Sequence, residues 1–510
     1  MVFTNTRESG LETLIVKWLV EQNGYEEGTN ADYNKEYAID ETRLFRFLQD
    51  TQPSQMGILG VFQSEQKKRQ FLNRLQGELV KRGIVDVLRN GIKVYPVDLI
   101  MFYLTPTENN EKAREMFQKN IFSVTRQLRY SQDAGKLALD LCLFINGLPV
   151  ITFELKNQLT KQNVDDAVQQ YKDDRDPREM LFQFKRCMVH LAVDDARIKF
   201  CTRLAGKDSW FLPFDKGYND GAGNPPNPNG LMTDYLWKDI LTKEKLTLII
   251  ENYAQVVIEV DEDTKKKKEK QIFPRYHQLD VVTKLLNAVQ ENGIGRKYLI
   301  QHSAGSGKSN SIAWTAHQLS RLYDVKGEKQ FHSVIVVTDR TVLDDQLQDT
   351  IWQFEHADGV VGRINNKEGD GSKSEKLANA LENSQPIIIV TIQTFPFVLK
   401  AIENSVSLKQ RKYAVIADEA HSSQSGSTAR QLKEVLMSEE MDNDVVLSSE
   451  DILDATIAAR KGSSNLNYYA FTATPKSKTL ELFGRRPRPD EPASKTNKPE
   501  PFHVYSMRHA

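Results

Sequence analysis

Three side chains in the N-terminal half have the types and spacing of a metal-dependent hydrolytic site. Asp140 interrupts one apolar run, and Glu154 and Lys156 lie in the next apolar run. Two carboxylates on adjacent strands can share a Mg²⁺ ion, which polarises a phosphate and activates a water. A lysine two residues after the second acid points to the same strand face, where it can orient that water. The pattern predicts a catalytic and metal-binding centre that hydrolyses phosphodiesters.

The register of the two runs provides a geometric test of this centre. The dipeptide Asn146-Gly147 separates the runs and is typical of a tight turn between antiparallel strands. Carboxylates inside otherwise apolar strands need a partner or a metal ion. A strict two-residue turn would leave Asp140 and Glu154 on opposite faces of the hairpin. A shared metal ion therefore predicts a three-residue loop or a bulge, either of which restores both acids to one face.

A second candidate site lies in the segment HSAGSGKS, which follows the apolar run KYLIQ and precedes a helix-like stretch. A loop between a strand and a helix N-terminus directs backbone N–H groups and the helix dipole at one point, which suits phosphate. Glycines allow close approach, the lysine contacts the β- and γ-phosphates, and the serine ligates Mg²⁺. His302 stands where this motif usually has its first glycine. The segment predicts an ATP site formed by Gly305, Ser306, Gly307, Lys308 and Ser309.

A later apolar strand ends in the tetrapeptide Asp418-Glu419-Ala420-His421. The carboxyl ends of parallel strands are where doubly wound folds bind ligands. In this setting the first acid holds Mg²⁺, and the second positions and polarises the attacking water. We therefore expect Asp418 to ligate the metal with Ser309, Glu419 to be catalytic, and His421 to belong to the nucleotide site.

The elements that must carry these two sites differ between the halves of the chain. After residue 272, short β-branched runs alternate with helix-length segments, a pattern typical of buried parallel strands in a doubly wound α/β domain. These runs are KYLIQ, HSVIVVT, PIIIVTI, YAVIADEA and NYYAFTAT. Before residue 260 the pattern is mixed and opens with an amphipathic helix. We expect domains over 1–260 and 273–490, a charged linker over 261–272, and over 491–510 the start of a connection to a further lobe.

Composition excludes several classes of protein. The 39% hydrophobic and 27% charged content is that of a globular protein. No run approaches the ~18 apolar residues that span a bilayer, no secretory signal is visible, and three cysteines are too few for a disulfide framework. We expect a cytoplasmic protein without a membrane partner. The formal net charge of −1 does not indicate a nucleic-acid partner, so such binding must rest on local sites.

GSGKS, DEAH and TATP, in this order, resemble the first three motifs of superfamily 2 helicases. The upstream segment PRYHQLDVV resembles the element whose glutamine reads adenine in that family, which makes Gln278 the candidate. The resemblance implies a RecA-like lobe that binds ATP. It also implies a second lobe for ATP turnover, and we expect the chain to be a truncated form that lacks this lobe.

The segment NGLPVITFELKN resembles the nuclease segment of the restriction (R, HsdR-like) subunit of type I restriction-modification enzymes, which have a PD-(D/E)xK fold. AVQQYKDDRDP, VHLAVD and FLPFDKG resemble the same family. This resemblance implies an ATP-dependent, type I site-specific deoxyribonuclease of bacteria or archaea, which cleaves double-stranded DNA with Mg²⁺ and translocates it with ATP. It also implies methyltransferase (M) and specificity (S) subunits as partners.

Three further candidate residues follow from the nuclease resemblance. In such nucleases a glutamate on the first helix assists the metal, and Glu12 fits by position, although an amphipathic surface glutamate is the expected interpretation. Related sequences carry QxxxY after the lysine, but residue 167 is alanine here. Gln170 and Tyr171 are then candidates for positioning DNA, with core packing as the alternative for Tyr171.

Two other functions compete with this interpretation. A type III restriction subunit resembles the motor motifs, but that group carries its nuclease after the motor, which disfavours it. The first domain could instead be a nuclease-inactive DNA-binding or assembly module attached to a helicase ATPase lobe.

Overall fold

The computed structural model describes residues 8–106, 110–132, 137–157, 161–260, 264–338, 342–354, 360–363, 373–392, 394–418, 465–492 and 494–509. The chain forms two compact units, Met1–Tyr276 and His277–Ala510. Within the described ranges, the helices are too short or too polar to cross a membrane.

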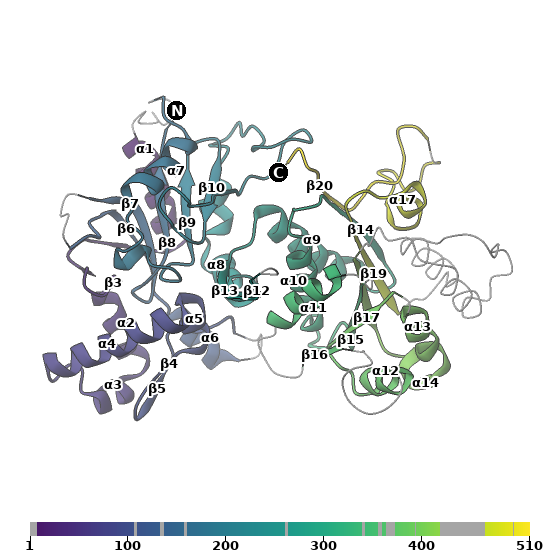
Figure 1. The fold of residues 1–510 in the computed structure, drawn as a ribbon, viewed down its shortest axis with the longest axis horizontal. Helices are drawn as coiled ribbons and strands as arrows, with labels where there is room; N and C mark the ends of the chain where they lie inside the picture. Colours follow the sequence, from purple (N-terminus) through teal and green to yellow (C-terminus); the bar gives the residue numbers. More distant parts are fainter. Residues whose placement is uncertain are drawn as a thin grey trace. The chain divides into compact units, whose positions relative to one another are not determined.

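A seven-stranded mixed sheet lies at the centre of the first unit, in the order β1-β6-β7-β8-β9-β10-β11 (Figure 1). Its strands are β1 (Glu26–Gly28), β6 (Phe122–Leu128), β7 (Leu139–Ile145), β8 (Leu148–Leu155), β9 (Val189–Val193), β10 (Ile198–Cys201) and β11 (Leu212–Pro213). The pairs β1–β6 and β8–β9 are parallel, and the other pairs are antiparallel. Strand β8 is buried along its whole length because it is central in the sheet and apolar on both faces.

The helices of the first unit are α1 (Glu8–Glu21), α2 (Glu41–Thr51), α3 (Pro53–Leu59), α4 (Glu65–Arg82), α5 (Ile84–Asn90), α6 (Glu111–Gln118), α7 (Val164–Asp174) and α8 (Lys243–Asn252), with short turns Met180–Phe182 and Leu236–Ile240. Helix α7 packs against β8, β9 and β10. Asn163 and Asp166 form a capping box at its start. Asp194, which follows β9, also accepts a hydrogen bond from the Val164 N–H at 2.8 Å. The start of α7 is therefore tied to the sheet.

The hairpin β7–β8 combines a two-residue turn with a bulge. Asn146 and Gly147 both have positive φ, as a type I′ hairpin turn requires. Ile145 pairs with Leu148, but the register then shifts, which leaves Val150 as an extra residue on β8. Pro149 lies beside this bulge, a position at which proline is tolerated in a sheet. The bulge expected for a shared metal site is thus present.

The segment expected to be a charged linker, 261–272, is partly a strand of the first unit. β13 (Lys267–Ile272) pairs antiparallel with β12 (Gln255–Val260) over six residue pairs. Most of its lysines are consecutive, and the segment has no apolar face of its own. In the sequence alone it is therefore typical of a solvated hinge, and it becomes a strand by pairing with the β-branched strand β12. Two smaller hairpins are β2 (Tyr33–Asn34) with β3 (Ile39–Asp40), and β4 (Ile92–Val94) with β5 (Val97–Leu99). The division between the units falls after Tyr276.

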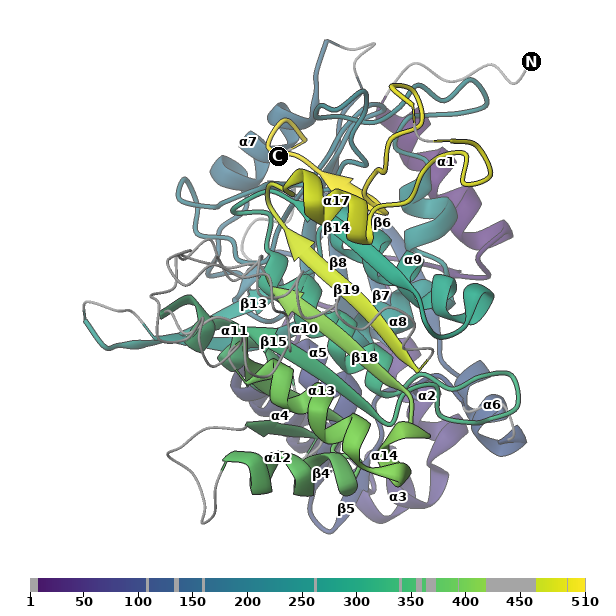
Figure 2. The ribbon, with the colours of Figure 1, turned by 90° about the vertical axis from the view of Figure 1, so that its right-hand side faces the viewer.

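The second unit is a doubly wound domain whose seven strands are all parallel, in the order β16-β17-β15-β18-β19-β14-β20. Figure 2 shows β14, β19, β18 and β15 side by side. The strands are β14 (Lys297–His302), β15 (Ser333–Thr338), β16 (Val361–Arg363), β17 (Ile387–Thr391), β18 (Tyr413–Asp418), β19 (Leu466–Thr472) and β20 (His503–Tyr505). The five strands expected from the sequence are confirmed.

The helices of the second unit are α9 (Tyr276–Asn292), α10 (Lys308–Ser320), α11 (Val342–Gln353), α12 (Lys373–Glu382), α13 (Phe395–Asn404), α14 (Val406–Lys409) and α17 (Ser477–Phe483). The segment 491–510 was expected to begin a connection to a further lobe. Instead, residues 503–505 within it form β20, which pairs with β14 at the edge of this sheet. A three-residue strand after a Pro- and Lys-rich stretch has too little periodicity to be recognised in the sequence.

The turn of the β7–β8 hairpin gives a direct test of the fold. A Cβ atom on Gly147 would overlap the Asp40 carbonyl oxygen and would lie 2.6 Å from the Leu44 backbone nitrogen. We expect Gly147→Ala to lower the free energy of unfolding by roughly 2–4 kcal/mol, because positive φ and backbone overlap both disfavour the side chain. Gly77→Ala is the matched control, since Gly77 lies inside α4 and a Cβ atom added there would meet nothing within 4 Å. Urea denaturation should show the control unchanged or stabilised, and equal effects of both variants would contradict the tight turn.

Candidate active sites

Asp140 and Glu154 lie opposite one another on β7 and β8. Leu141 pairs with Phe153, so the next residues along the two antiparallel strands are Asp140 and Glu154. The Oδ2 atom of Asp140 accepts a hydrogen bond from the Leu155 N–H at 2.7 Å. The bulge at Val150 produces this alignment, because without it the two acids would be offset by one residue and face opposite sides.

Glu154 is fully buried, and Arg175 at the end of α7 contacts it. The Nε of Arg175 donates to Glu154 Oε1 at 2.5 Å, and its terminal nitrogens donate to the Ala138 carbonyl at 2.9 Å and the Tyr130 hydroxyl at 3.3 Å. Burial raises the pKa of the Glu154 carboxyl well above its usual range, and Asp140 adds to the rise. Arg175 and Lys156 oppose it by stabilising the carboxylate. Glu154 thus lies near a second carboxylate, which raises its pKa, and near two cations, which lower it.

The second oxygen of Glu154, Oε2, is buried and has no hydrogen-bond partner in the structure. Such an atom is costly unless something positive fills the space beside it. In the described part of the chain, no group of three or more His, Cys, Asp or Glu side chains could enclose a metal ion. Mg²⁺ commonly uses one or two carboxylates and takes its remaining ligands from water and substrate phosphate. Asp140 and Glu154 fit that donor set.

Lys156 completes the expected trio. It is two residues beyond Glu154, and its side chain is nearly buried. Its backbone N–H donates to the Val193 carbonyl at 2.9 Å, which fixes the strand end. Because β-strand side chains alternate, Lys156 projects to the same face as Glu154. Its influence on the pKa of Glu154 places its charge near the carboxylate.

Glu12 is buried, contrary to the surface position expected from its helix. Its oxygens accept hydrogen bonds from Arg126 Nε at 2.7 Å and Gln127 Nε2 at 2.6 Å. The same Gln127 nitrogen donates to Asp140 Oδ1 at 3.2 Å. Helix α1 faces the sheet at β6, which is why an acid that breaks the apolar stripe is still covered. Glu12 therefore reaches the acid pair through Gln127.

The two candidates on α7 have different surroundings. Tyr171 is fully buried, and its hydroxyl lies 2.8 Å from Thr152 Oγ1, which in turn lies 2.7 Å from His190 Nδ1. Burial lowers the pKa of His190 to about 3, so its ring is neutral. Tyr171 therefore packs in the core beneath the acid pair. Gln170 is half-buried.

The phosphate-binding loop connects β14 to α10 as expected. Gly305 and Gly307 have positive φ, and Gly307 directly precedes the first turn of α10. A Cβ atom on Gly307 would lie 2.5 Å from the Gln278 side-chain nitrogen, so this position requires glycine. Lys308 and Ser309 begin the helix, where backbone N–H groups and the helix dipole favour an anion.

Asp418 is the last residue of β18, at the same sheet edge as this loop. Strand β19 lies between β18 and β14, pairing Asp418 with Phe471 and Gln301 with Thr472. Two strand spacings correspond to about 10 Å, a separation that a nucleotide–metal complex can bridge. The predicted residues Glu419 and His421 lie outside the described part of the chain.

Gln278, the candidate for reading adenine, contacts the phosphate loop itself. Its amide nitrogen donates to the carbonyl of Gly307 at 3.0 Å and, more weakly, to that of Ser306 at 3.4 Å. The ring of His277 also contacts the Ser306 carbonyl, at 3.0 Å, and stacks on Tyr505 with 3.5 Å between ring centroids. The start of α9 thus holds the loop backbone.

His302, which replaces the usual glycine, belongs to a buried polar chain. Its Nε2 lies 2.9 Å from His503 Nδ1, and His503 Nε2 lies 2.9 Å from Asp280 Oδ2. The Ser303 N–H donates to the Tyr505 carbonyl at 2.9 Å. Strand β20 therefore contacts the first residues of the phosphate loop directly.

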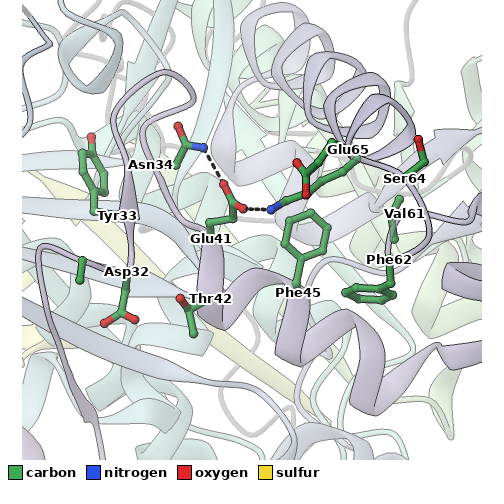
Figure 3. Close-up of a pocket in the computed structure, with 12 residues that line it drawn as sticks. Asp32, Tyr33, Asn34, Glu41, Thr42, Phe45, Val61, Phe62, Ser64 and Glu65 are labelled. Atoms are coloured by element: carbon green, nitrogen blue, oxygen red, sulfur yellow. Dashed lines mark hydrogen bonds and ion pairs between the residues drawn. The ribbon is translucent and has the colours of Figure 1, made fainter.

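A separate cavity of about 530 Å³ lies in the first unit among α2, α4 and the loop before β2 (Figure 3). Asn34 donates to Glu41 at 2.5 Å, and Lys68 pairs with the same carboxylate. Asp32 and Glu65 also line it. Its lining does not include Asp140, Glu154 or Lys156, so this cavity is separate from the acid pair.

Sequence reasoning missed the residues that hold the acids and the loop in place. Arg175 lies in a segment used for the family resemblance, but an arginine after a run of acids is typical of a solvated helix end. Gln127 and His503 have no local signal, since each acts on a residue far away in the chain. His302 stands out in the sequence only as a departure from the glycine pattern.

Two family models match the chain. Residues 5–209 match the model described as type I restriction enzyme R protein N terminus, and residues 277–441 match SWI2/SNF2 ATPase. The first match covers the acid pair and Lys156, and the second covers the phosphate loop and Asp418.

Curated relatives match across both units. The HindI type I restriction enzyme endonuclease subunit of Haemophilus influenzae is 26% identical over 372 residues, which are 69% of this chain and 32% of that protein. The putative MjaVIIIP endonuclease subunit of Methanocaldococcus jannaschii is 23% identical over 389 residues, which are 72% of this chain and 35% of that protein. The chain thus spans about a third of the length of these relatives.

Among solved structures, the Sulfolobus solfataricus SWI2/SNF2 ATPase core in complex with dsDNA matches 40% of this chain and 33% of its own, with 11% identity and a TM-score of 0.22, too low to bear on the fold. The family models and the curated relatives carry the assignment. The chain is HsdR-like: residues 5–209 resemble the N terminus of type I restriction R proteins, and residues 277–441 resemble a SWI2/SNF2 ATPase.

Proposed function

We propose that the chain is the DNA-cleaving and motor part of a type I restriction endonuclease subunit. Its first unit hydrolyses phosphodiester bonds of double-stranded DNA with Mg²⁺, and its second unit binds ATP to drive translocation. The observation that carries the nuclease proposal is the alignment of Asp140 with a buried Glu154 whose Oε2 has no hydrogen-bond partner. By likeness to its relatives, the chain would act in the cytoplasm with methyltransferase and specificity subunits.

In this proposal each side chain has a distinct task. A bound Mg²⁺ would assist the hydrolysis by drawing charge from the scissile phosphate. Asp140 and Glu154 would hold the ion, and Lys156 would orient the attacking water and offset the charge that develops on the phosphate. Arg175 holds one oxygen of Glu154, favours the ionised form of the carboxyl and leaves the other oxygen open. Gln127 orients Asp140.

One observation favours the alternative, a nuclease-inactive DNA-binding or assembly module. Arg175 already neutralises Glu154, and a buried ion pair of this kind also occurs as a structural feature. The two functions differ in whether the acid pair and Lys156 are needed for metal-dependent cleavage or only for folding.

Cleavage of supercoiled plasmid in Mg²⁺ separates the two functions. We expect Asp140→Asn and Lys156→Ala each to reduce nicking by about 100-fold or more, since each removes a group that acts on the reacting phosphate. Asp165→Asn is the matched control, because Asp165 is an exposed acid on α7 that pairs with Lys199. Nicking by both site variants at the wild-type rate, with unchanged melting temperatures, would exclude the proposed nuclease.

Replacement of Arg175 should lower the free energy of unfolding by an amount that depends on pH. Arg175→Met leaves Glu154 buried without its counter-charge, which costs about 3–5 kcal/mol once the carboxyl is ionised. Burial raises the folded pKa of Glu154 to about 8, from about 4.3 in the unfolded chain, and it rises further in the variant. An acid with a raised folded pKa loses stability as the pH increases toward that value, so the wild type stops losing stability above about pH 8 while the variant continues. The deficit measured by urea denaturation should therefore be larger at pH 9.5 than at pH 7.

Two controls test this account of Arg175. Arg178→Met removes an exposed arginine that pairs with Asp176, and it should leave the free energy of unfolding nearly unchanged. Glu154→Gln in the Arg175→Met background removes the uncompensated charge and should flatten the pH dependence. A deficit independent of pH would mean that Arg175 acts through packing alone.

Nucleotide binding by the second unit depends on Lys308 in this proposal. Lys308→Ala should reduce affinity for ATP below detection in calorimetry, because it removes the cation that contacts the β- and γ-phosphates. Lys326→Ala, in an exposed turn of the same unit, is the matched control and should bind as wild type. Unchanged binding by Lys308→Ala would contradict the assigned loop.

A further inference from the structure

A cavity of about 580 Å³ opens at the far edge of the first unit's sheet, away from the acidic cavity described above. Strands β10 and β11, the loop 202–210 and the hairpin β12–β13 surround it. Strand pairing gives the position of the cavity relative to the acid pair. Glu154 on β8 pairs with Ala192 on β9, and Ala192 pairs with Lys199 on β10. The neighbouring residue, Phe200, lines the cavity. The cavity therefore begins two strands from Glu154, and the side chain of Phe200 is on the opposite face of the sheet from that of Glu154.

Aromatic rings and an arginine line this cavity. Trp210 is 77% exposed, although it is one of the largest apolar side chains. Phe184 lies on the cavity wall, and the guanidinium of Arg203 is 5.0 Å from its ring centroid. A single exposed aromatic residue is unremarkable. Three aromatic rings, counting Phe200, and an arginine around one cavity, however, form a surface on which a planar base can stack.

The hairpin β12–β13 brings a row of lysines to the rim. Residues 264–270 are all exposed, and Lys268 and Lys270 line the cavity itself. Of the nearby acids, Glu259 pairs with Lys270 at 2.8 Å and Glu269 pairs with Lys185 at 2.8 Å. Asp208 also lines the cavity and offsets one cation. Arg203, Lys268 and the lysines at 265–267 leave a positive excess.

The hairpin is fixed to the domain at its base. Gln271 is buried, and its side-chain nitrogen donates to the carbonyls of Cys187 and Met188, both at 2.8 Å. Lys185 is buried as well, and its bond to Glu269 joins the hairpin to the chain segment before β9. The lysines therefore have a defined position beside the cavity, which favours a binding function over that of a spacer.

We propose that this cavity binds an unpaired nucleotide of a DNA strand. The base stacks against Trp210 and Phe184, and the neighbouring phosphates contact Lys268 and the lysines of the hairpin. The inference rests on the proposed nuclease function and adds a site that would hold a locally unpaired strand near the cleavage centre.

The test is binding of a fluorescein-labelled oligothymidylate to the whole chain, measured by anisotropy in EDTA so that no cleavage occurs. Trp210→Ala should weaken binding roughly 5- to 100-fold, the effect of losing one base–aromatic stack. Lys266→Ala and Lys268→Ala should each lower the salt dependence of log K by about 0.7. Tyr95→Ala and Lys93→Ala are matched controls, since Tyr95 is 96% exposed and Lys93 is exposed, both in the β4–β5 hairpin.

A second readout assigns the contact to this cavity. An oligonucleotide carrying 5-bromodeoxyuridine should photocrosslink to the peptide that contains Trp210, and the crosslink should disappear in Trp210→Ala. Two results would overturn the inference. The first is wild-type affinity in Trp210→Ala together with crosslinks only at other peptides. The second is that Trp210→Ala loses binding to a protein partner while its DNA binding stays intact. Binding is measured in EDTA and nicking in Mg²⁺, so failure of this site would leave nicking intact, and failure of the nuclease would leave the Trp210-dependent binding intact.

Discussion

The alignment of β8 with β7 depends on one extra residue in β8. The register shifts between Phe144 and Leu143, and Val150 is left without a partner of its own on β7. All residues beyond the bulge are thereby shifted by one position relative to β7. The face that carries Glu154 and Lys156 is then the face that carries Asp140. Without the bulge, Asp140 and Glu154 would lie on opposite faces of the sheet.

Burying Glu154 creates an electrostatic problem that neighbouring elements solve together. Helix α7 supplies Arg175 at its end, and the start of the same helix is capped by Asn163 and tied to Asp194. The arginine also binds Ala138 beside β7, so it joins the two strands that carry the acids. Buried ion pairs are weak sources of net stability. Their value here lies in orientation, because one carboxylate oxygen is held while the other stays available.

Much of the fold follows from local patterns in the sequence. The five buried strands of the second unit are short, β-branched and separated by helix-length segments, and each lies where the sequence predicts it. The bulge was expected because the chemistry of Asp140 and Glu154 required it. Charged β13 could not be recognised, since Lys267–Ile272 has no apolar face of its own and gains its strand structure from pairing with β12. The positions of Arg175 and Gln127 could not be predicted, because their partners lie on other elements and no spacing connects them.

The phosphate loop is completed by residues far from it in the chain. His302 and Ser303 contact β20, whose residues His503 and Tyr505 lie about two hundred positions later. During synthesis the chain leaves the ribosome from its N-terminus. The strand and helix that flank the loop are made early, but the edge strand that braces them arrives only after most of the domain has emerged. A nascent chain therefore cannot assemble its finished nucleotide pocket until translation has passed residue 505.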